Sequence, residues 1–259
     1  PTTIPHTMKQ LIIEHAVARE ALRLGLGHHK LIARPLLGAR RNQSMEDRMS
    51  AQSRTASYID MSKIEWVGGT GGLLSHAPRR IQSMLALIDG FGVEGVTKLF
   101  QDSVFMIPHL GVLSTVYPKA ALEIFEKDCL IRLGTCVAFS GKLSEKDYGK
   151  KIADLSIKMP DGSVLEKEIE YGTIQRIDIG EGETAEIEGN VSSPFSLTTK
   201  TSSGRRIAER VEGGVAGVII DARGRSVDLP EDADARRRKL REWYRALEAY
   251  PSHILEEES

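Results

Sequence analysis

The sequence IEWVGGTGG at residues 64–72 decides how this chain is interpreted, because a short apolar strand runs directly into a glycine-rich turn. The turn consists of Gly68, Gly69, Thr70, Gly71 and Gly72. Glycines at the end of a strand let the backbone approach a ligand with no side chain in between. The amide hydrogens of the turn, and the N-terminus of a following helix, favour a polar or anionic group. The spacing fits neither the dinucleotide fingerprint nor a P-loop. The residues therefore leave two interpretations open, a ligand site or a tight turn needed only for packing.

The residues that follow the turn favour the ligand site. Ser75 can cap a helix whose first turn accepts Pro78, and this places Arg79 and Arg80 near the start of that helix. The helix dipole disfavours a cation there by about 0.3–1 kcal/mol. Two arginines are easier to understand if one of them reaches an anion or stacks on a ring. The alternative is that Arg80 points into solvent, and His76 beside them is interpreted as a polar surface residue.

Working outward from the turn, the first part of the chain alternates between helical and strand-like stretches. An amphipathic helix is predicted from Thr7 to Pro35, and the helix after the turn is expected to end at Gly90. The other predictions are an exposed polar segment at 40–57, a strand at 102–107, a loop at 109–111, a helix from 118 through 125 and a strand at 130–137. This alternation predicts an α/β layer.

The composition changes at residues 140–150, where Gly, Ser, Lys and Asp cluster, and we place a domain boundary there. Residues 1–140 form the predicted α/β lobe with the glycine-rich turn, and residues 150–259 form the second domain. In the second domain, short strands at 155–159, 164–169, 173–179, 184–187 and 215–220 predict a small β-barrel or sandwich. A C-terminal amphipathic helix closes the chain, with an inward stripe of Leu240, Trp243, Tyr244 and Leu247.

Composition limits the partners and the compartment. The chain has 259 residues, of which 41% are apolar and 27% charged, with a net charge of −1. These values are typical of a globular protein, and the near-zero charge gives no reason to expect nucleic acid or an anionic membrane as a partner. No apolar run approaches the ~20 residues of a membrane span. Cys129 and Cys136 lie in one apolar stretch and are expected to be reduced, buried thiols, which indicates a cytoplasmic location.

Other chemistry-bearing residues give weaker patterns. The pair at 28–29 is two histidines without a second pair at metal spacing, so no metal site is predicted. Asp102, Ser103 and His109 could form a hydrolase triad, a distant alternative because no nucleophile elbow is present. The basic run at 236–239 follows acidic residues on the last helix, and a solvated, salt-bridged face explains it better than a nucleic-acid patch.

The long central stretch resembles a known family. It runs from Ile64 to Gly141 and contains WVGGTGGLLSHAPRR at 66–80 and LIDGFGVEGVTKLFQDSVFMIPHLGVLSTVYPKAALEIFEKDCLIRLGTCVA at 87–138. They resemble the MutL family that accompanies glutamate mutase, a coenzyme B12 enzyme, and not the unrelated mismatch-repair protein of the same name. Weaker resemblance extends to EHAVAREALRLGLGHHK at 14–30, EGGVAGVIIDARGR at 212–225 and RRRKLREWYRALEAYP at 236–251.

The resemblance implies a fold and a function. The fold would be part of an actin/Hsp70-like (ribonuclease H-like) ATPase lobe, followed by a small, mostly-β domain and a C-terminal helix. The resemblance also implies that the chain acts as an accessory or reactivating factor for a B12-dependent mutase, so a subunit of such a mutase is the implied partner. The turn would hold the adenosine part of ATP or ADP, through residues that match the family's motif: Gly68, Gly69, Thr70, Gly71, Gly72, Ser75 and Arg79.

The sequence also departs from such ATPases. It contains neither the early Asp-Phe-Gly-type phosphate loop nor the later Asp-Ile-Gly-Gly-type turn. Without those aspartates, nothing visible would hold Mg²⁺ or position the attacking water. The chain therefore resembles the C-terminal half of a MutL protein, and the missing N-terminal ATPase half is a second implied partner. We expect half of an ATP site, no catalytic residue, no bound metal and negligible hydrolysis by this chain alone. The alternative is a non-catalytic interaction module whose glycine turn is structural.

Overall fold

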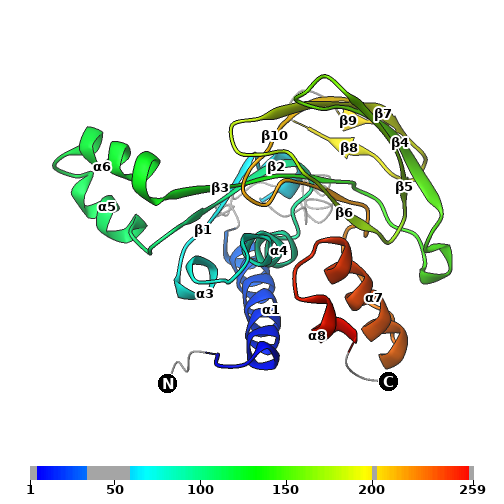
Figure 1. Ribbon diagram of the computed structural model, residues 1–259, viewed down its shortest axis with the longest axis horizontal. Helices are drawn as coiled ribbons and strands as arrows, with labels where there is room; N and C mark the ends of the chain where they lie inside the picture. The colour runs from blue at the N-terminus through cyan, green and yellow to red at the C-terminus, as the bar shows by residue number, and fades with distance from the viewer. Residues whose placement is uncertain (1–4, 34–58, 200–202, 257–259) are drawn as a thin grey trace, which may run out of the picture.

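The computed structural model describes residues 5–33, 59–199 and 203–256 as a mixed α/β structure with two main sheets (Figure 1). The first sheet has five strands in the order β1-β2-β3-β11-β6. Its strands are β1 (Trp66–Gly69), β2 (Gly95–Asp102), β3 (Leu130–Ala138), β6 (Ile174–Ile177) and β11 (Val218–Asp221). β1 runs parallel to β2 and β3 parallel to β11, while β2 is antiparallel to β3.

The second sheet is antiparallel, with four strands in the order β10-β7-β4-β5. Its strands are β4 (Lys151–Lys158), β5 (Val164–Glu170), β7 (Thr184–Val191) and β10 (Arg206–Glu212), and a short pair, β8 (Leu197–Thr198) and β9 (Ser203–Gly204), lies beside it. The hairpin between β4 and β5 confirms the turn predicted around Pro160-Asp161-Gly162.

The first sheet lies between helices and the second sheet (Figure 1). Its helical cover comes from α1 (Met8–Ile32), α4 (Arg80–Phe91) and α7 (Ala233–Ala246). On β11, Ile219 packs into the core beneath the helices, whereas Val218 and Ile220 pack into the core between the sheets. Because successive side chains of a strand point to opposite faces, an apolar run such as this must be covered on both sides.

The first sheet, which is covered on both faces, takes its strands from both sides of the domain boundary predicted at residues 140–150. Both β6 and β11 lie beyond that boundary, yet they complete the sheet that begins with β1, β2 and β3. The core between the sheets likewise contains Val137 from β3 together with Ile157 from β4. Residues 150–259 therefore contribute strands to both sheets, and the two layers of strands that pack together are the first and second sheets.

The inward stripe of the last helix is confirmed. Trp243 and Leu247 are buried, while Leu240 and Tyr244 are half-buried against the same core. Asp232 caps α7 by accepting a hydrogen bond of 2.7 Å from the amide of Ala235. The short helix α8 (Ser252–Glu256) follows. The first helix is also confirmed to Ile32, but its predicted end at Pro35 and the exposed segment at 40–57 fall outside the described residues.

Three local predictions were wrong. The strand expected at 102–107 is β2 (Gly95–Asp102), and the loop expected at 109–111 lies within helix α5 (Ile107–Leu113). Pro108 occupies the first turn of α5, where its missing amide hydrogen costs nothing, so it begins a helix instead of ending a strand. Helix α4 ends at Phe91, because Gly92 and not Gly90 takes the left-handed C-cap conformation, with φ of 55°.

Beyond β2 the chain forms a projecting arm. It consists of α5, α6 (Pro118–Ile124) and the π-helical turn η2 (Phe125–Cys129), and it extends past the end of the sheet (Figure 1). The prediction of a helix from Pro118 through Phe125 is confirmed for α6 and continues into η2. The remaining described elements are the short helix α3 (Gly72–Ser75) and two 3-10 turns, η1 (Met61–Lys63) and η3 (Glu145–Asp147).

Candidate functional site

The glycine-rich turn lies at the carboxyl end of β1. In the parallel pair, Gly69 of β1 is level with Gln101 of β2, so the next residues along, Thr70 and Asp102, meet at one edge of the sheet. Ligands of α/β proteins characteristically bind at the carboxyl ends of strands. The first turn after the glycines is the short helix α3 (Gly72–Ser75), which is followed by α4.

The four glycines of the turn differ in the space that each leaves for an added side chain. A Cβ added at Gly68 would overlap the ring of Phe100, and one added at Gly69 would lie 2.6 Å from Cδ1 of Leu74. Packing alone therefore accounts for these two glycines. Gly71 has a φ of 109°, which strains any other residue, but a Cβ there would meet nothing within 4 Å. At Gly72 an added Cβ would meet only His76, at 3.9 Å. The open side of the turn is thus its second half.

Thr70 ties the turn to the end of β2. Its hydroxyl donates a hydrogen bond of 3.1 Å to Oδ2 of Asp102, a buried carboxylate. The same carboxylate accepts hydrogen bonds from the amides of Val104 at 3.2 Å and Ile107 at 2.7 Å. Burial alone would raise the pKa of Asp102, but these backbone donors and Thr70 lower it below its usual range. The ionised carboxylate therefore organises the entry into α5.

Ser75 and Arg79 each form a side-chain hydrogen bond with the protein itself. Ser75 is buried and does not cap α4 as predicted, because its hydroxyl donates a 2.6 Å hydrogen bond to the carbonyl of Asp102. Arg79 is itself the N-cap residue of α4, and its Nη1 donates a 2.6 Å hydrogen bond to the carbonyl of Glu248. Arg80 donates to the carbonyl of Ser75 at 2.8 Å instead of pointing freely into solvent. Of the predicted site residues, the structure brings together Gly68, Gly69, Thr70, Gly71 and Gly72.

The distant triad is not assembled. Asp102 is buried and its side chain is occupied by the turn, while the hydroxyl of Ser103 donates to the carbonyl of Asp128 at 3.3 Å. His109 is exposed on α5, and within the described part of the chain no hydrogen bond joins it to Ser103. The hydrogen-bonded relay that a nucleophile and base require is therefore absent from these three residues.

The remaining candidates have structural surroundings. In the basic run at 236–239, Arg237 pairs with Asp234 and Lys239 with Glu242, as predicted for a salt-bridged face. Cys129 and Cys136 are buried free thiols, as predicted. Among the described residues, no group of three or more His, Cys, Asp or Glu side chains could hold a metal ion. None of the helices in the described ranges is long and apolar enough to cross a membrane.

Sequence reasoning missed a cavity of about 540 Å³ at the opposite edge of the sheet. Asp221, at the end of β11, is level with Ala138, and Ala138 is level with Gly95 at the start of β2. The loop after β11 therefore lies at the edge remote from the glycine-rich turn, and it forms one wall of the cavity. No motif marks this cavity, because α1, α4, α7 and this loop each contribute only a few residues to it.

The comparisons with known proteins identify a family. The family model described as MutL protein matches residues 1–129, a stretch that contains the glycine-rich turn, α4 and the arm. No curated protein and no solved structure matches the chain. Through residues 1–129, the chain belongs to the MutL family associated with glutamate mutase, which is distinct from the mismatch-repair protein of the same name.

Proposed function

We propose that this chain is a cytoplasmic accessory or reactivating factor for a coenzyme B12-dependent mutase of the glutamate mutase type. In this proposal its first sheet and helices form part of an actin/Hsp70-like ATPase lobe, and the glycine-rich turn holds the adenosine part of ATP or ADP. The observation that carries the proposal is the open backbone at Gly71 and Gly72, at the carboxyl end of β1 within the family match. Packing explains Gly68 and Gly69 but leaves this open half without a structural reason beyond the φ of Gly71.

The contacts around the turn limit which part of a nucleotide the turn would hold. Thr70, Ser75 and Arg79 each donate a side-chain hydrogen bond to another residue of the protein. The turn therefore offers chiefly the backbone of Gly71 and Gly72, which suits a ribose or base better than a phosphate chain with Mg²⁺. The phosphate-binding loops and the metal would come from the N-terminal ATPase half, so this chain supplies half of an ATP site and no catalytic residue.

Calorimetry with ADP tests the half-site. The variant Gly72→Val places a branched side chain over the open backbone without a positive φ or a clash within the protein. Gly111→Val on α5 is the matched control, because an added Cβ there meets nothing within 4 Å, and one at Gly72 meets only His76 at 3.9 Å. We expect Gly72→Val to weaken ADP binding at least tenfold and Gly111→Val to leave it unchanged. The proposal fails if ADP does not bind even when the N-terminal half is supplied, or if both variants bind as the parent does.

The arm offers a surface for the mutase. Val112 on α5 is 73% exposed, and Val116 between the two helices is 67% exposed. Further exposed apolar side chains are Tyr117 and Leu122 on the arm, and Val104 and Phe105 in the segment that leads from β2 into it. Apolar side chains gathered on one projecting element are typical of protein interaction sites. We propose that this surface contacts the mutase.

A binding experiment with a B12-dependent mutase subunit tests whether the arm, and not another exposed surface of the chain, contacts the mutase. Val112→Glu introduces a charge on the arm, whereas Val164→Glu introduces the same charge on β5 at a valine that is 59% exposed. Biolayer interferometry should show at least a tenfold loss for Val112→Glu and little change for Val164→Glu. Equal affinities for the two variants would argue against docking through the arm.

The second candidate function is an interaction module without nucleotide. The specific observation in its favour is that Gly68 and Gly69 are already required by packing against Phe100, Leu74 and Leu87. This alternative predicts that Val112→Glu abolishes partner binding while ADP binds neither the parent nor any glycine variant. The calorimetric and interferometric results together decide between the two.

A further inference from the structure

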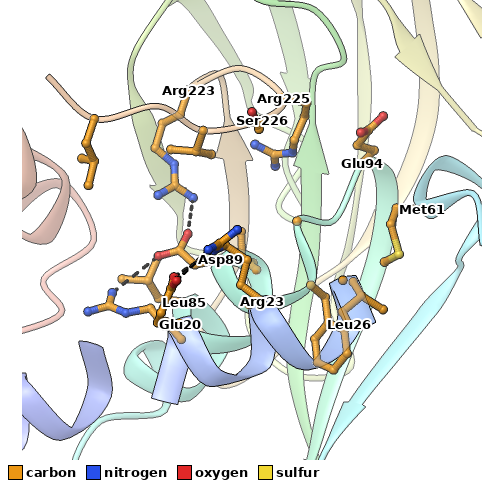
Figure 2. Close-up of a pocket in the computed structure, with 18 of the residues that line it drawn as sticks. Glu20, Arg23, Leu26, Met61, Leu85, Asp89, Glu94, Arg223, Arg225 and Ser226 are labelled. Atoms are coloured by element: carbon orange, nitrogen blue, oxygen red, sulfur yellow. Dashed lines mark hydrogen bonds and ion pairs between the residues drawn. The ribbon is translucent and has the colours of Figure 1, made fainter. Parts of the chain in front are cut away.

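The cavity at the edge remote from the turn is lined by two kinds of side chain. Its apolar surface comes from residues such as Leu26 of α1, Ile88 of α4 and Trp243 of α7. Its basic side chains come from α1 and from the loop after β11, so that Arg23 approaches from one side and Arg223 and Arg225 from the other (Figure 2). A volume of about 540 Å³ lies within the range of small-molecule sites, which are mostly apolar with a few convergent polar groups.

A network of charged side chains lies against the cavity, and Asp89, Arg223 and Arg225 of this network line it. The guanidinium of Arg223 donates to Asp221 at 2.7 Å and to Asp89 at 2.7 Å, and it stacks over Trp243 at 5.0 Å. Arg225 donates to the same carboxylate of Asp221 at 3.0 Å. Burial alone would raise the pKa of Asp221, but the two arginines lower it far below its usual range, so this carboxylate is ionised.

Counting these charges leaves a positive excess. Arg19 pairs with Asp89 at 3.5 Å, so the network contains three arginines, Arg19, Arg223 and Arg225, against two carboxylates. The side chains of the three arginines are no more than 12% exposed. Buried charge without a counter-charge is costly, so such a network favours an anion that enters the cavity.

Two further cations stand at the cavity wall on α1. Arg23 is 60% exposed and pairs with Glu20, and Lys30 is half-buried. Within the described ranges, Lys30 forms no ion pair, and Nη1 of Arg223 takes part in no hydrogen bond. These groups leave donors for an incoming acid. Glu94 also lines the cavity, and the 3.1 Å hydrogen bond that it accepts from Ser140 leaves its negative charge in place. With Glu94 included, five cations face four carboxylates, and one positive charge remains in excess: the cations are Arg19, Arg23, Lys30, Arg223 and Arg225, and the carboxylates are Glu20, Asp89, Glu94 and Asp221.

We propose that this cavity binds a small organic anion, whose apolar body lies among Leu26, Ile88 and Trp243 and whose carboxylate or phosphate head group faces the arginines. The site is independent of the nucleotide half-site, because it lies at the opposite edge of the first sheet. Its ligand is defined by this combination of an apolar body and one anionic group.

The first test varies the head group on one apolar body. The probes are octanoate, octyl phosphate, 1-octanol and octylammonium, each titrated into the chain by calorimetry below its micelle concentration. Octanoate or octyl phosphate should bind at least tenfold more tightly than octanol, and octylammonium should not bind. The stronger of the two anions identifies the head group. Equal binding of octanol and octanoate, or no binding of either anion, overturns the proposal.

The second test uses two glycines of the same helix. Gly27 lines the cavity and Gly25 does not, and an added Cβ meets nothing within 4 Å at either position. Gly27→Leu should fill part of the cavity and weaken the tighter anion at least tenfold, whereas Gly25→Leu should change its affinity less than twofold. The Cβ of neither substitution clashes with the fold, and thermal unfolding checks that both variants remain folded. Equal affinities for the two variants overturn the assignment to this cavity.

A third variant keeps the proposal testable if Gly27→Leu does not fold. Arg23→Gln removes an exposed charge at the wall, and Arg210→Gln removes one from β10, away from the cavity. Arg23→Gln should weaken the anion several-fold without affecting octanol, and Arg210→Gln should change neither. If the two variants bind the anion equally, Arg23 does not face the ligand and the proposed charge complementarity is wrong.

Discussion

The hydroxyl of Thr70 lies 3.1 Å from Oδ2 of Asp102 and joins the glycine-rich turn to the segment that leads into the arm. Oδ2 also accepts the amide of Ile107, the first residue of α5, at 2.7 Å. One buried carboxylate thus fixes both the proposed nucleotide turn and the base of the proposed docking surface. A second link joins the same two segments, because the hydroxyl of Ser75 donates to the carbonyl of Asp102 at 2.6 Å.

Replacing Asp102 should loosen both elements. Asp102→Asn turns one acceptor oxygen into a donor, so at least one of the contacts with Thr70, Val104 or Ile107 becomes donor against donor. Hydrogen bonds to a buried charged group contribute about 1.5–3 kcal/mol, and we expect the free energy of unfolding to fall by about 2 kcal/mol. Urea denaturation at pH 7 measures it, with Asp128→Asn on the exposed part of the arm as the control. Equal stabilities of the two variants would show that Asp102 is not the organising group.

The same variant has a definite pH dependence. Because the pKa of Asp102 is lowered in the folded state, its ionisation stabilises the protein above the unfolded pKa of about 4, and this stabilisation is lost as the pH falls below that value. The difference in unfolding free energy between the parent and Asp102→Asn should therefore shrink between pH 5 and pH 3. A constant difference over that range would contradict the lowered pKa.

The glycines of the turn should divide into two classes. Gly68→Ala forces a methyl group against the ring of Phe100, and overpacking of this kind costs about 1–3 kcal/mol. Gly72→Ala meets only His76 at 3.9 Å and should leave stability unchanged or slightly higher. Thermal unfolding measures both. The smaller ring-free side chain in Phe100→Leu should partly rescue Gly68→Ala, and a lack of rescue would mean that the clash is not the cause.

The sequence predicted the elements whose periodicity is local. The amphipathic stripe of α7, the hairpin at Pro160-Asp161-Gly162 and the strand that became β3 follow from patterns read within a few residues. β2 was missed because Gly95, Lys98 and Gln101 interrupt its apolar pattern, although Gln101 is fully buried. Such a strand is specified by its neighbours β1 and β3 and not by its own composition.

The site was predictable only in part, for a related reason. The glycine turn is contiguous, so its place after β1 could be read directly from the chain. The role of Ser75 could not, since its partner is the carbonyl of Asp102, 27 residues away. The cavity is harder still, because Arg23 and Arg225 come together only when α1 packs beside the loop after β11. Charge networks of this kind carry no signature of spacing in the sequence.

Arg79 gives a test of the narrowed nucleotide site. Its bond to the carbonyl of Glu248, together with the 2.8 Å bond from Gln82 to the carbonyl of Ala249, ties the start of α4 to the segment after α7. Arg79→Met should lower the free energy of unfolding by about 1 kcal/mol without changing ADP affinity. The control is Arg238→Met on the exposed face of α7. A loss of ADP affinity at unchanged stability would instead place the Arg79 guanidinium on the nucleotide.

His15 should make the protein sensitive to mild acid. It is buried on α1, its Nδ1 lies 2.9 Å from the hydroxyl of Tyr250, and burial, with a smaller effect of Arg19, lowers its pKa to about 4. In the unfolded chain the pKa of histidine is about 6.5, so the unfolded state binds the proton first as the pH falls. The contribution of neutral His15 to stability is therefore fully present above about pH 6.5, and the free energy of unfolding falls by about 2–3 kcal/mol as the pH decreases towards 4.

In His15→Gln, which keeps a polar group near Tyr250, this fall in the free energy of unfolding should be smaller by that amount. His109→Gln on exposed α5 should lose stability as the parent does. Urea denaturation at half-unit steps from pH 7.5 to pH 4 measures the slopes, and parallel curves for the parent and His15→Gln would show that His15 is not the titrating group.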